Sequence, residues 1–335
     1  MSAPAPSMFS TAATELIKKN DYEVGKPNLS VFAETLLDLA RSDRQIIAVT
    51  SDSRGSGKIG PLGEELPEQL VEVGIAEQNL VGVAAGLASC GKIVYAVSPS
   101  CFLTARSLEQ IKNDVCYSDN PVKLIGISAG VSYGALGSTH HSLHDLAALR
   151  AINNIDIVAP ADNFETEQAI RAAALQTKPI YIRFGKVPMV TLPRLNNTFE
   201  VGKASIVREG NDIAFIATGE TVIHALLAAE ALAERGLQCR VVSMHTIKPL
   251  DEEVLIECGD QCSAIITVEE HMVHGGLGDA CARVLLESGN HVAFRAVGIP
   301  DEYTVTGSQS DIFRHYGISM EGLTETAMQL MERVP

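Results

Sequence analysis

A single carboxylate interrupts a long run of small and apolar residues in the first third of the chain. Glu77 lies in VGIAEQNLVGVAAGLASCG, residues 73–91, where Gln78 and Asn79 are its only close polar neighbours. Most glutamates are exposed on helix surfaces, but these neighbours leave almost no polar face, so we expect Glu77 to be buried. Burial disfavours the charged form of a carboxyl group, which suits a group that shares or donates a proton near neutral pH.

Histidines and cysteines do not form a metal-binding pattern. His140, His141 and His144 lie within five residues, but such a cluster binds metal only with suitable partners and geometry, so we expect no metal site in this chain. The seven cysteines contain no CxxC pair. Their irregular spacing, in a chain without a signal peptide, predicts reduced thiols and a cytoplasmic location.

Composition limits the possible partners. With 335 residues, 46% of them hydrophobic, the chain is long enough for one large or two ordinary domains. The net charge of −15 and the pI near 5.0 argue against nucleic acid or an anionic membrane surface, since both attract a positive face. The longest apolar stretch, residues 80–97, is interrupted by several glycines and by Lys92, so no membrane span is predicted.

Short apolar runs alternate with helix-length segments through the first half of the chain. The strand-like runs are QIIAVTSDS, KIVYAVSPS, VKLIGISAG, DIVAPAD and PIYIRFGK. Residues 30–41 form a helix candidate, because Phe32, Leu36, Leu39 and Ala40 share one face. Strands separated by helices need crossover connections, which predicts a mostly parallel sheet.

The alternation restarts after VPMVTLPRLNNTFEVGK, residues 187–203, which we interpret as a domain connection. The later strand-like runs are DIAFIATGE, QCRVVSMHTI, SAIITVEEH and VAFRAVGI, with a helix candidate at residues 221–235. We therefore predict an α/β protein of two domains, residues 26–190 and 196–335, each with a mostly parallel sheet flanked by helices. Residues 1–25 are expected to form an extended or partly disordered arm.

Taken in order, these motifs resemble a known enzyme family. VEVGIAEQNLVGVAAGLA resembles the glutamate motif in the pyrimidine-binding domain of thiamine diphosphate enzymes of the transketolase group, including 1-deoxyxylulose-5-phosphate synthase. The resemblance continues through SCFLTARSLEQIKNDV, GSTHHSLHDLAALR, IDIVAPADNFE and PIYIRFGK, and through IATGETVIHALLAAEALAERG, TVEEHMVHGGLGDA and GIPDEYTVTG in the C-terminal domain. It covers nearly everything from residue 28 to residue 325, and such an ordered set is far more specific than any single motif.

The resemblance implies that Glu77 and Phe102 contact the cofactor. The family glutamate hydrogen-bonds N1′ of the aminopyrimidine and favours the imino tautomer, which prepares thiamine diphosphate to attack a ketose carbonyl. The chemistry belongs to the cofactor, and the protein tunes it. Phe102, in FLTARS, matches a family aromatic that packs on the pyrimidine ring, although an ordinary core phenylalanine would give the same pattern.

The resemblance also implies substrate-binding residues. His140 matches a family histidine that hydrogen-bonds an oxygen of the donor and assists proton transfer; a histidine that caps a buried polar group is the alternative. Arg183, in YIRFGK, matches an arginine that binds the substrate phosphate, and a strand-end salt bridge is the alternative. Asp52 and Arg54 lie in the glycine-rich loop SDSRGSGK, where the family places a loop near cofactor and substrate, although such loops are more often plain turns.

Two departures from the family pattern bear on the donor. Leu136, in ALGSTHH, stands where transketolases usually have an aspartate that contacts a donor hydroxyl. Ser128, in GISAG, stands where the family often has a phosphate-binding histidine. Both changes favour a donor that differs from the usual pentose phosphate, such as a branched, deoxy or otherwise modified ketose phosphate.

A missing motif predicts a partner. Transketolases of full length carry a separate domain whose GDG motif and asparagine hold Mg²⁺ and the cofactor diphosphate, and this sequence has no GDG. The chain therefore resembles the C-terminal half of a split transketolase. This predicts a large partner subunit, a heterotetramer with two copies of each chain, and no activity for this chain alone.

Three alternatives remain open from the sequence. One is a piece of a 1-deoxyxylulose-5-phosphate synthase, which is normally one longer chain. Another is the β subunit of a 2-oxo acid dehydrogenase, although GSTHH fits transketolases better. The third is a non-catalytic partner subunit, and the joint presence of Glu77, Phe102 and His140 argues against it.

Overall fold

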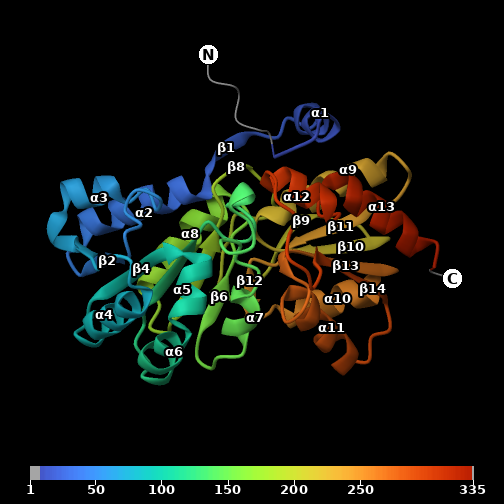
Figure 1. Ribbon diagram of the computed structural model, residues 1–335. Coiled ribbons are helices and arrows are strands. Elements are labelled where there is room, and N and C mark those ends of the chain that lie inside the picture. Colours follow the sequence, from blue (N-terminus) through green and yellow to red (C-terminus); the bar gives the residue numbers. More distant parts are fainter. Residues whose placement is uncertain (1–7, 334–335) are drawn as a thin grey trace, which may run out of the picture.

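Two large β-sheets lie side by side, each sandwiched between helices (Figure 1). The computed structural model describes residues 8–333. The first sheet has seven strands in the order β12-β6-β7-β5-β4-β2-β3, and the second has five in the order β14-β13-β10-β11-β9. This architecture confirms the predicted fold class.

The first sheet is parallel except for β12 at its edge. Its strands from the first half of the chain are β2 (Ile46–Thr50), β3 (Leu70–Glu72), β4 (Ile93–Pro99), β5 (Lys123–Ile127), β6 (Asp156–Val158) and β7 (Ile180–Phe184). Helices cover both faces, so the central strands are buried along their whole length and consist largely of Val, Ile and Leu.

Different helices cover the two faces of this sheet. One face packs against α2 (Asn28–Ser42), α3 (Gly60–Glu65) and α8 (Asn163–Leu175). The other packs against α4 (Glu77–Ser89), α7 (Asp145–Arg150) and a π-helical segment, Ile111–Tyr117, which follows α5 (Ser100–Arg106) and α6 (Leu108–Gln110). The predicted helix at residues 30–41 is α2, and its apolar stripe is buried as expected.

The second sheet is built in the same way. Its parallel strands are β10 (Ile213–Ala217), β11 (Cys239–Ser243), β13 (Ala264–Met272) and β14 (Ala293–Ile299), and β9 (Ser205–Arg208) is antiparallel to β11. One face carries α9 (Val222–Ala233), α12 (Gln309–His315) and α13 (Met320–Met331); the other carries α10 (Glu252–Gln261) and α11 (Leu277–Glu287) (Figure 1).

A strand from the second half of the chain belongs to the first sheet. QCRVVSMHTI was predicted as a single strand of the second domain, but the structure divides it into β11 and β12 (Thr246–Lys248). β12 pairs antiparallel with β6, with Thr246 opposite Val158. The additional strand covers the exposed backbone of a short edge strand, which is a common way to protect a sheet edge.

The prediction of an extended N-terminal arm is wrong for the part that the structure describes. α1 (Thr11–Lys19) is a helix that begins at a Ser10 cap and buries Ala13 and Ile17 in the core that also contains α9. After it, β1 (Val24–Pro27) pairs with β8 (Pro188–Val190). The cap and the apolar pair one helical turn apart explain why this segment is ordered. Residues 1–7 of the predicted arm lie outside the described residues.

No helix in the described part of the chain is both long and apolar enough to cross a bilayer. All seven cysteines are free thiols, and six of them are buried.

Candidate active site at the carboxyl edge of the first sheet

The residues singled out in the sequence follow the carboxyl ends of neighbouring strands. In open α/β sheets this edge is where ligands bind, because the loops after adjacent parallel strands converge there. The candidates that follow β2, β3, β4 and β5, or lie at the end of β7, are Asp52, Arg54, Glu77, Phe102, Ser128, Leu136, His140 and Arg183.

Glu77 is buried, as its apolar surroundings predict. It is the first residue of α4, where the helix N-terminus favours a carboxylate, and it is 4% exposed. Its partner is Arg106, the last residue of α5, whose Nη1 donates to Oε1 at 2.9 Å and to Oε2 at 3.0 Å. The carboxylate is therefore held at the edge of the sheet by one half-exposed arginine.

A row of rings and cations extends from this ion pair. The Cζ atom of Arg106 lies 4.3 Å from the centroid of the Phe102 ring. His140 lies between Phe102 and Tyr133, with ring centroids 5.3 Å and 5.4 Å apart, and meets both rings edge to face. Nζ of Lys186 lies 3.7 Å from the centroid of Tyr133. The fold thus joins Glu77, Phe102 and His140 in one continuous surface.

Sequence reasoning missed Arg106, Tyr133 and Lys186. One signal was available: Arg106 is four residues after Phe102, which places both on the same face of a helix. Lys186 is half-buried, its pKa is lowered by burial, and no carboxylate lies within ion-pair distance of it among the residues that the structure describes. A cation without an ion-pair partner, placed over the Tyr133 ring in an acidic protein, is suited to bind an anion.

Arg183, predicted to bind the substrate phosphate, is buried and has partners within the chain. Its side chain is 4% exposed, and Nη1 donates to Oδ1 of Asp145 at 2.7 Å while Nη2 donates to the Glu270 carbonyl at 2.8 Å. The alternative interpretation, a strand-end salt bridge, is the one that these contacts support. The ion pair was hidden from the sequence because Asp145 and Glu270 come from other elements of the fold.

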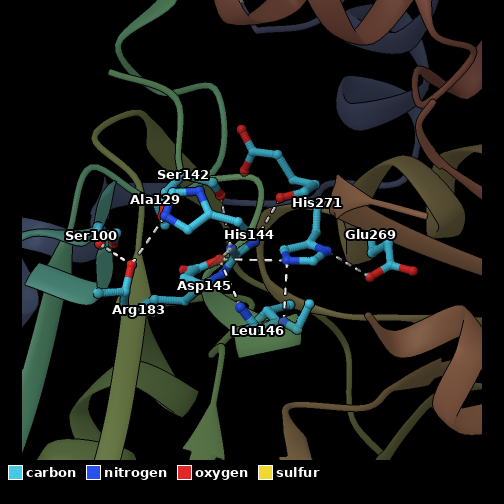
Figure 2. Close-up of polar contacts among 12 residues, drawn as sticks. Ser100, Ala129, Ser142, His144, Asp145, Leu146, Arg183, Glu269 and His271 are labelled. Carbon is cyan, nitrogen blue, oxygen red and sulfur yellow. Dashed lines mark hydrogen bonds and ion pairs between the residues drawn. The ribbon is translucent and has the colours of Figure 1, made fainter. Parts of the chain in front are cut away.

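A buried polar chain links the two sheets behind the candidate site. Figure 2 shows Asp145, His271 and Glu269 following one another across the boundary between the sheets. Burial works against ionisation of Asp145, but the charge of Arg183 holds the pKa of this carboxyl below its ordinary value. Burial lowers the pKa of His271 to about 4, so this imidazole is neutral at pH 7. This polar chain therefore contains one fixed ion pair, Arg183–Asp145, beside a neutral imidazole.

A carboxyl pair completes this region. Nε2 of Gln309 donates to Oε2 of Glu220 at 3.1 Å and to Oε1 of Glu270 at 2.8 Å. Burial raises the pKa of both carboxyl groups, and the charge of Glu220 raises that of Glu270 further. Gly130 has φ +56°, and a Cβ atom there would lie 2.1 Å from Cδ of Glu270. Only glycine therefore fits against this buried carboxyl group.

Ser128 and Leu136 both follow β5 but differ in exposure. Ser128 is fully buried, with φ +55°. Leu136 is 56% exposed and lies four residues before His140. An exposed apolar side chain in this position faces outward, where another molecule can cover it.

The loop with Asp52 and Arg54 is exposed and is arranged mainly by its backbone. The amide of Asp52 donates to Oε1 of Glu72 at 2.7 Å, and Nη2 of Arg54 donates to the Gly60 carbonyl at 3.2 Å. No contact in the structure joins either side chain to Glu77 within residues 8–333. The structure brings this loop to the same sheet edge, but not into the row of rings.

The side chains of this site fit the aminopyrimidine of thiamine diphosphate but not its diphosphate and Mg²⁺. A buried carboxylate beside an aromatic ring offers a hydrogen-bond acceptor and a stacking surface, which are the two interactions that an aminopyrimidine needs. For Mg²⁺ and a diphosphate the chain offers nothing comparable: no group of three or more potential metal ligands occurs within the described range.

Comparison with known proteins identifies the family of this chain. The family model for the transketolase pyrimidine-binding domain matches residues 28–188, and the model for the transketolase C-terminal domain matches residues 202–323. The chain belongs to the transketolase family. This confirms the resemblance, inferred from the motifs, to the C-terminal half of a split transketolase.

Individual relatives extend over almost the whole chain. The chain is 47% identical over 304 residues to an apulose-4-phosphate transketolase subunit of Phocaeicola vulgatus, covering 90% of this chain and 96% of the relative. It is 34% identical over 302 residues to a 6-deoxy-6-sulfo-D-fructose transketolase subunit of a Clostridium species, covering 90% and 94%. A solved split-gene transketolase, described as an inactive beta4 tetramer, is similar with a TM-score of 0.81 at 32% identity, covering 93% of this chain and 100% of the other.

Proposed function

We propose that this chain is the small subunit of a two-component transketolase that transfers a two-carbon ketol unit from a ketose phosphate to an aldose phosphate. The observation that carries the proposal is the continuous surface formed by Glu77, Phe102 and His140, with Glu77 buried and Phe102 beside it. The membership of the transketolase family supports it.

Each of these side chains has a defined task in the proposal. Thiamine diphosphate, when bound, supplies the carbon nucleophile. Glu77 accepts or donates the hydrogen bond to N1′ of its pyrimidine, and Phe102 packs against the pyrimidine ring. His140, one ring further along, hydrogen-bonds an oxygen of the donor sugar and assists in moving its proton. Mutual contacts fix the rings, so the protein orients both molecules before reaction.

A large partner subunit completes the site. It supplies the ligands for Mg²⁺ and the cofactor diphosphate, because the chain has no GDG motif and residues 8–333 contain no cluster of metal ligands. Two copies of each subunit form a heterotetramer. Residues 26–190 act as the pyrimidine-binding domain, residues 196–335 act as the C-terminal domain, and the free thiols are consistent with a cytoplasmic location.

The donor is a modified ketose phosphate. Leu136 presents an exposed apolar side chain where a carboxylate would recognise a hydroxyl. One relative is a transketolase subunit for 6-deoxy-6-sulfo-D-fructose, which supports a modified donor. Lys186 replaces Arg183 in our assignment as the cation that binds the substrate anion, because Arg183 is occupied by Asp145.

The test is ketol transfer by this chain, with and without the partner that co-purifies with it, in the presence of thiamine diphosphate and Mg²⁺. Ordinary, branched, deoxy and sulfonated ketose donors are compared. We expect transfer only in the complex, and loss of transfer in Glu77→Gln. A complex that binds the cofactor but transfers an acyl group to a lipoyl protein would instead establish a 2-oxo acid dehydrogenase subunit.

A further inference from the structure

Arg106 contacts both side chains that would hold the pyrimidine of the cofactor, Glu77 and Phe102. Its Nη1 donates to both carboxylate oxygens of Glu77, at 2.9 Å and 3.0 Å. Its guanidinium carbon also lies 4.3 Å from the centre of the Phe102 ring. A single side chain therefore takes the hydrogen-bond acceptor and one ring surface at the same time.

The guanidinium group resembles an aminopyrimidine in the features that this site recognises. Both groups are planar and have delocalised π electrons, and the guanidinium presents to Glu77 an N–H donor at the edge of its plane, as N1′ of the imino tautomer does. Glu77 is only 4% exposed, so little of its carboxylate is free to meet a second donor. Arg106 and a pyrimidine therefore cannot both bind Glu77 in this geometry.

We propose that Arg106 is an internal stand-in for the cofactor pyrimidine, which fills this position in the free subunit and is displaced when thiamine diphosphate binds. This inference rests on the proposed function, since it concerns the same cofactor. It assigns to Arg106 a role in positioning Glu77 and in setting the affinity for the cofactor.

The surroundings of Arg106 allow it to leave. It is the last residue of α5, and its side chain is 48% exposed, against 5% for that of Glu77. Within residues 8–333, Glu77 is the only carboxylate with which it forms an ion pair. Rotation into solvent therefore breaks one ion pair and one ring contact, and water rehydrates the guanidinium.

In the free subunit, before it binds its partner, Arg106 stabilises the buried carboxylate of Glu77. A buried carboxylate without a counter-charge is costly, and Arg106 supplies the counter-charge until the complex forms. The same ion pair opposes binding of the cofactor, because its energy is lost when the pyrimidine takes its place.

The test measures the dissociation constant of thiamine diphosphate, with Mg²⁺ present, for the assembled complex by titration calorimetry without sugar substrate. We expect Arg106→Met to bind the cofactor about five- to tenfold more tightly than the unaltered complex, because the competing ion pair is gone. Arg106→Lys, which keeps the charge but not the plane, is expected to fall between them. Arg171→Met is the matched control, since Arg171 is 39% exposed and forms ion pairs with Asp38 and Glu167 on another face.

Each other outcome has a definite meaning. Equal or weaker binding by Arg106→Met, with Arg171→Met unchanged, would overturn the role of Arg106 and leave the proposed function intact. A complex that does not bind thiamine diphosphate in any form, including the unaltered one, would overturn the proposed function and the stand-in together.

Discussion

Replacement of Asp145 by asparagine tests the assignment of Arg183 as a structural residue. Asp145 accepts from Nη1 of Arg183 at 2.7 Å, from the Tyr181 hydroxyl at 2.7 Å and from the Leu146 amide at 3.0 Å. Asp145→Asn preserves the shape of the side chain and removes its charge. The guanidinium of Arg183, 4% exposed, is then buried without a counter-ion.

The size of the effect follows from this burial. Loss of one partner of a fully buried ion pair costs about 3–5 kcal/mol of the free energy of unfolding, because the remaining charge stays desolvated. The pair between Arg171 and Asp38 is the matched control, with side chains 39% and 60% exposed. Its loss in Asp38→Asn should cost at most about 1 kcal/mol.

Chemical denaturation of the free subunit, followed by circular dichroism, measures both differences. The double variant Asp145→Asn/Arg183→Gln should recover part of the loss, because neither charge then remains buried alone. A change below about 1 kcal/mol in Asp145→Asn would refute the reasoning. So would an Arg183→Gln complex of normal stability whose only defect is a raised KM for the sugar phosphate, since that is the behaviour of a phosphate ligand.

Three further predictions follow from the site and its surroundings. Glu77→Gln should lower ketol transfer by at least about 100-fold in a complex that still assembles, while Glu68→Gln, whose side chain is 87% exposed, should transfer normally in the same assay. Burial, with the charge of Glu220, raises the pKa of Glu270 from 4.5 to about 8. Between these values the folded chain keeps a proton that the unfolded chain releases. The contribution of Glu270 to the free energy of unfolding is therefore complete below pH 4.5 and is lost as the pH rises through 8. Glu270→Gln should therefore flatten the fall in unfolding free energy over this window by up to about 1.4 kcal/mol per pH unit, and an unchanged slope would contradict the assignment. Gly130→Ala should destabilise the fold by about 1–3 kcal/mol in denaturation experiments, because its Cβ would lie 2.1 Å from Cδ of Glu270, whereas Gly86→Ala, with nothing within 4 Å, should be neutral or slightly stabilising.

Local patterns were sufficient for the elements that position the site. The apolar runs became β2, β4, β5, β6 and β7, and the amphipathic segment at residues 30–41 became α2. Because parallel strands end at a common edge, these strands bring the segments that carry Glu77, Phe102 and His140 to one side of the sheet. Glu77 is also buried, as the apolar composition of its segment predicts.

Local patterns failed where a contact between distant segments decided the structure. α1 is ordered because α9 offers it an apolar surface, and β12 leaves its own half of the chain because β6 presents an open edge. Neither surface is visible in the sequence of the segment that binds to it.

The sequence by itself determined the family and the alternation of strands and helices, and it indicated part of the residues at the carboxyl edge, without Arg106, Tyr133 and Lys186. Only the tertiary structure decided which charged side chains form ion pairs with one another. Arg183 is 38 residues from Asp145 and 87 from Glu270, and Arg106 is 29 from Glu77. Residue type records that a side chain is charged, but the strength of an ion pair depends on distance and burial, and both are fixed only when the chain has folded.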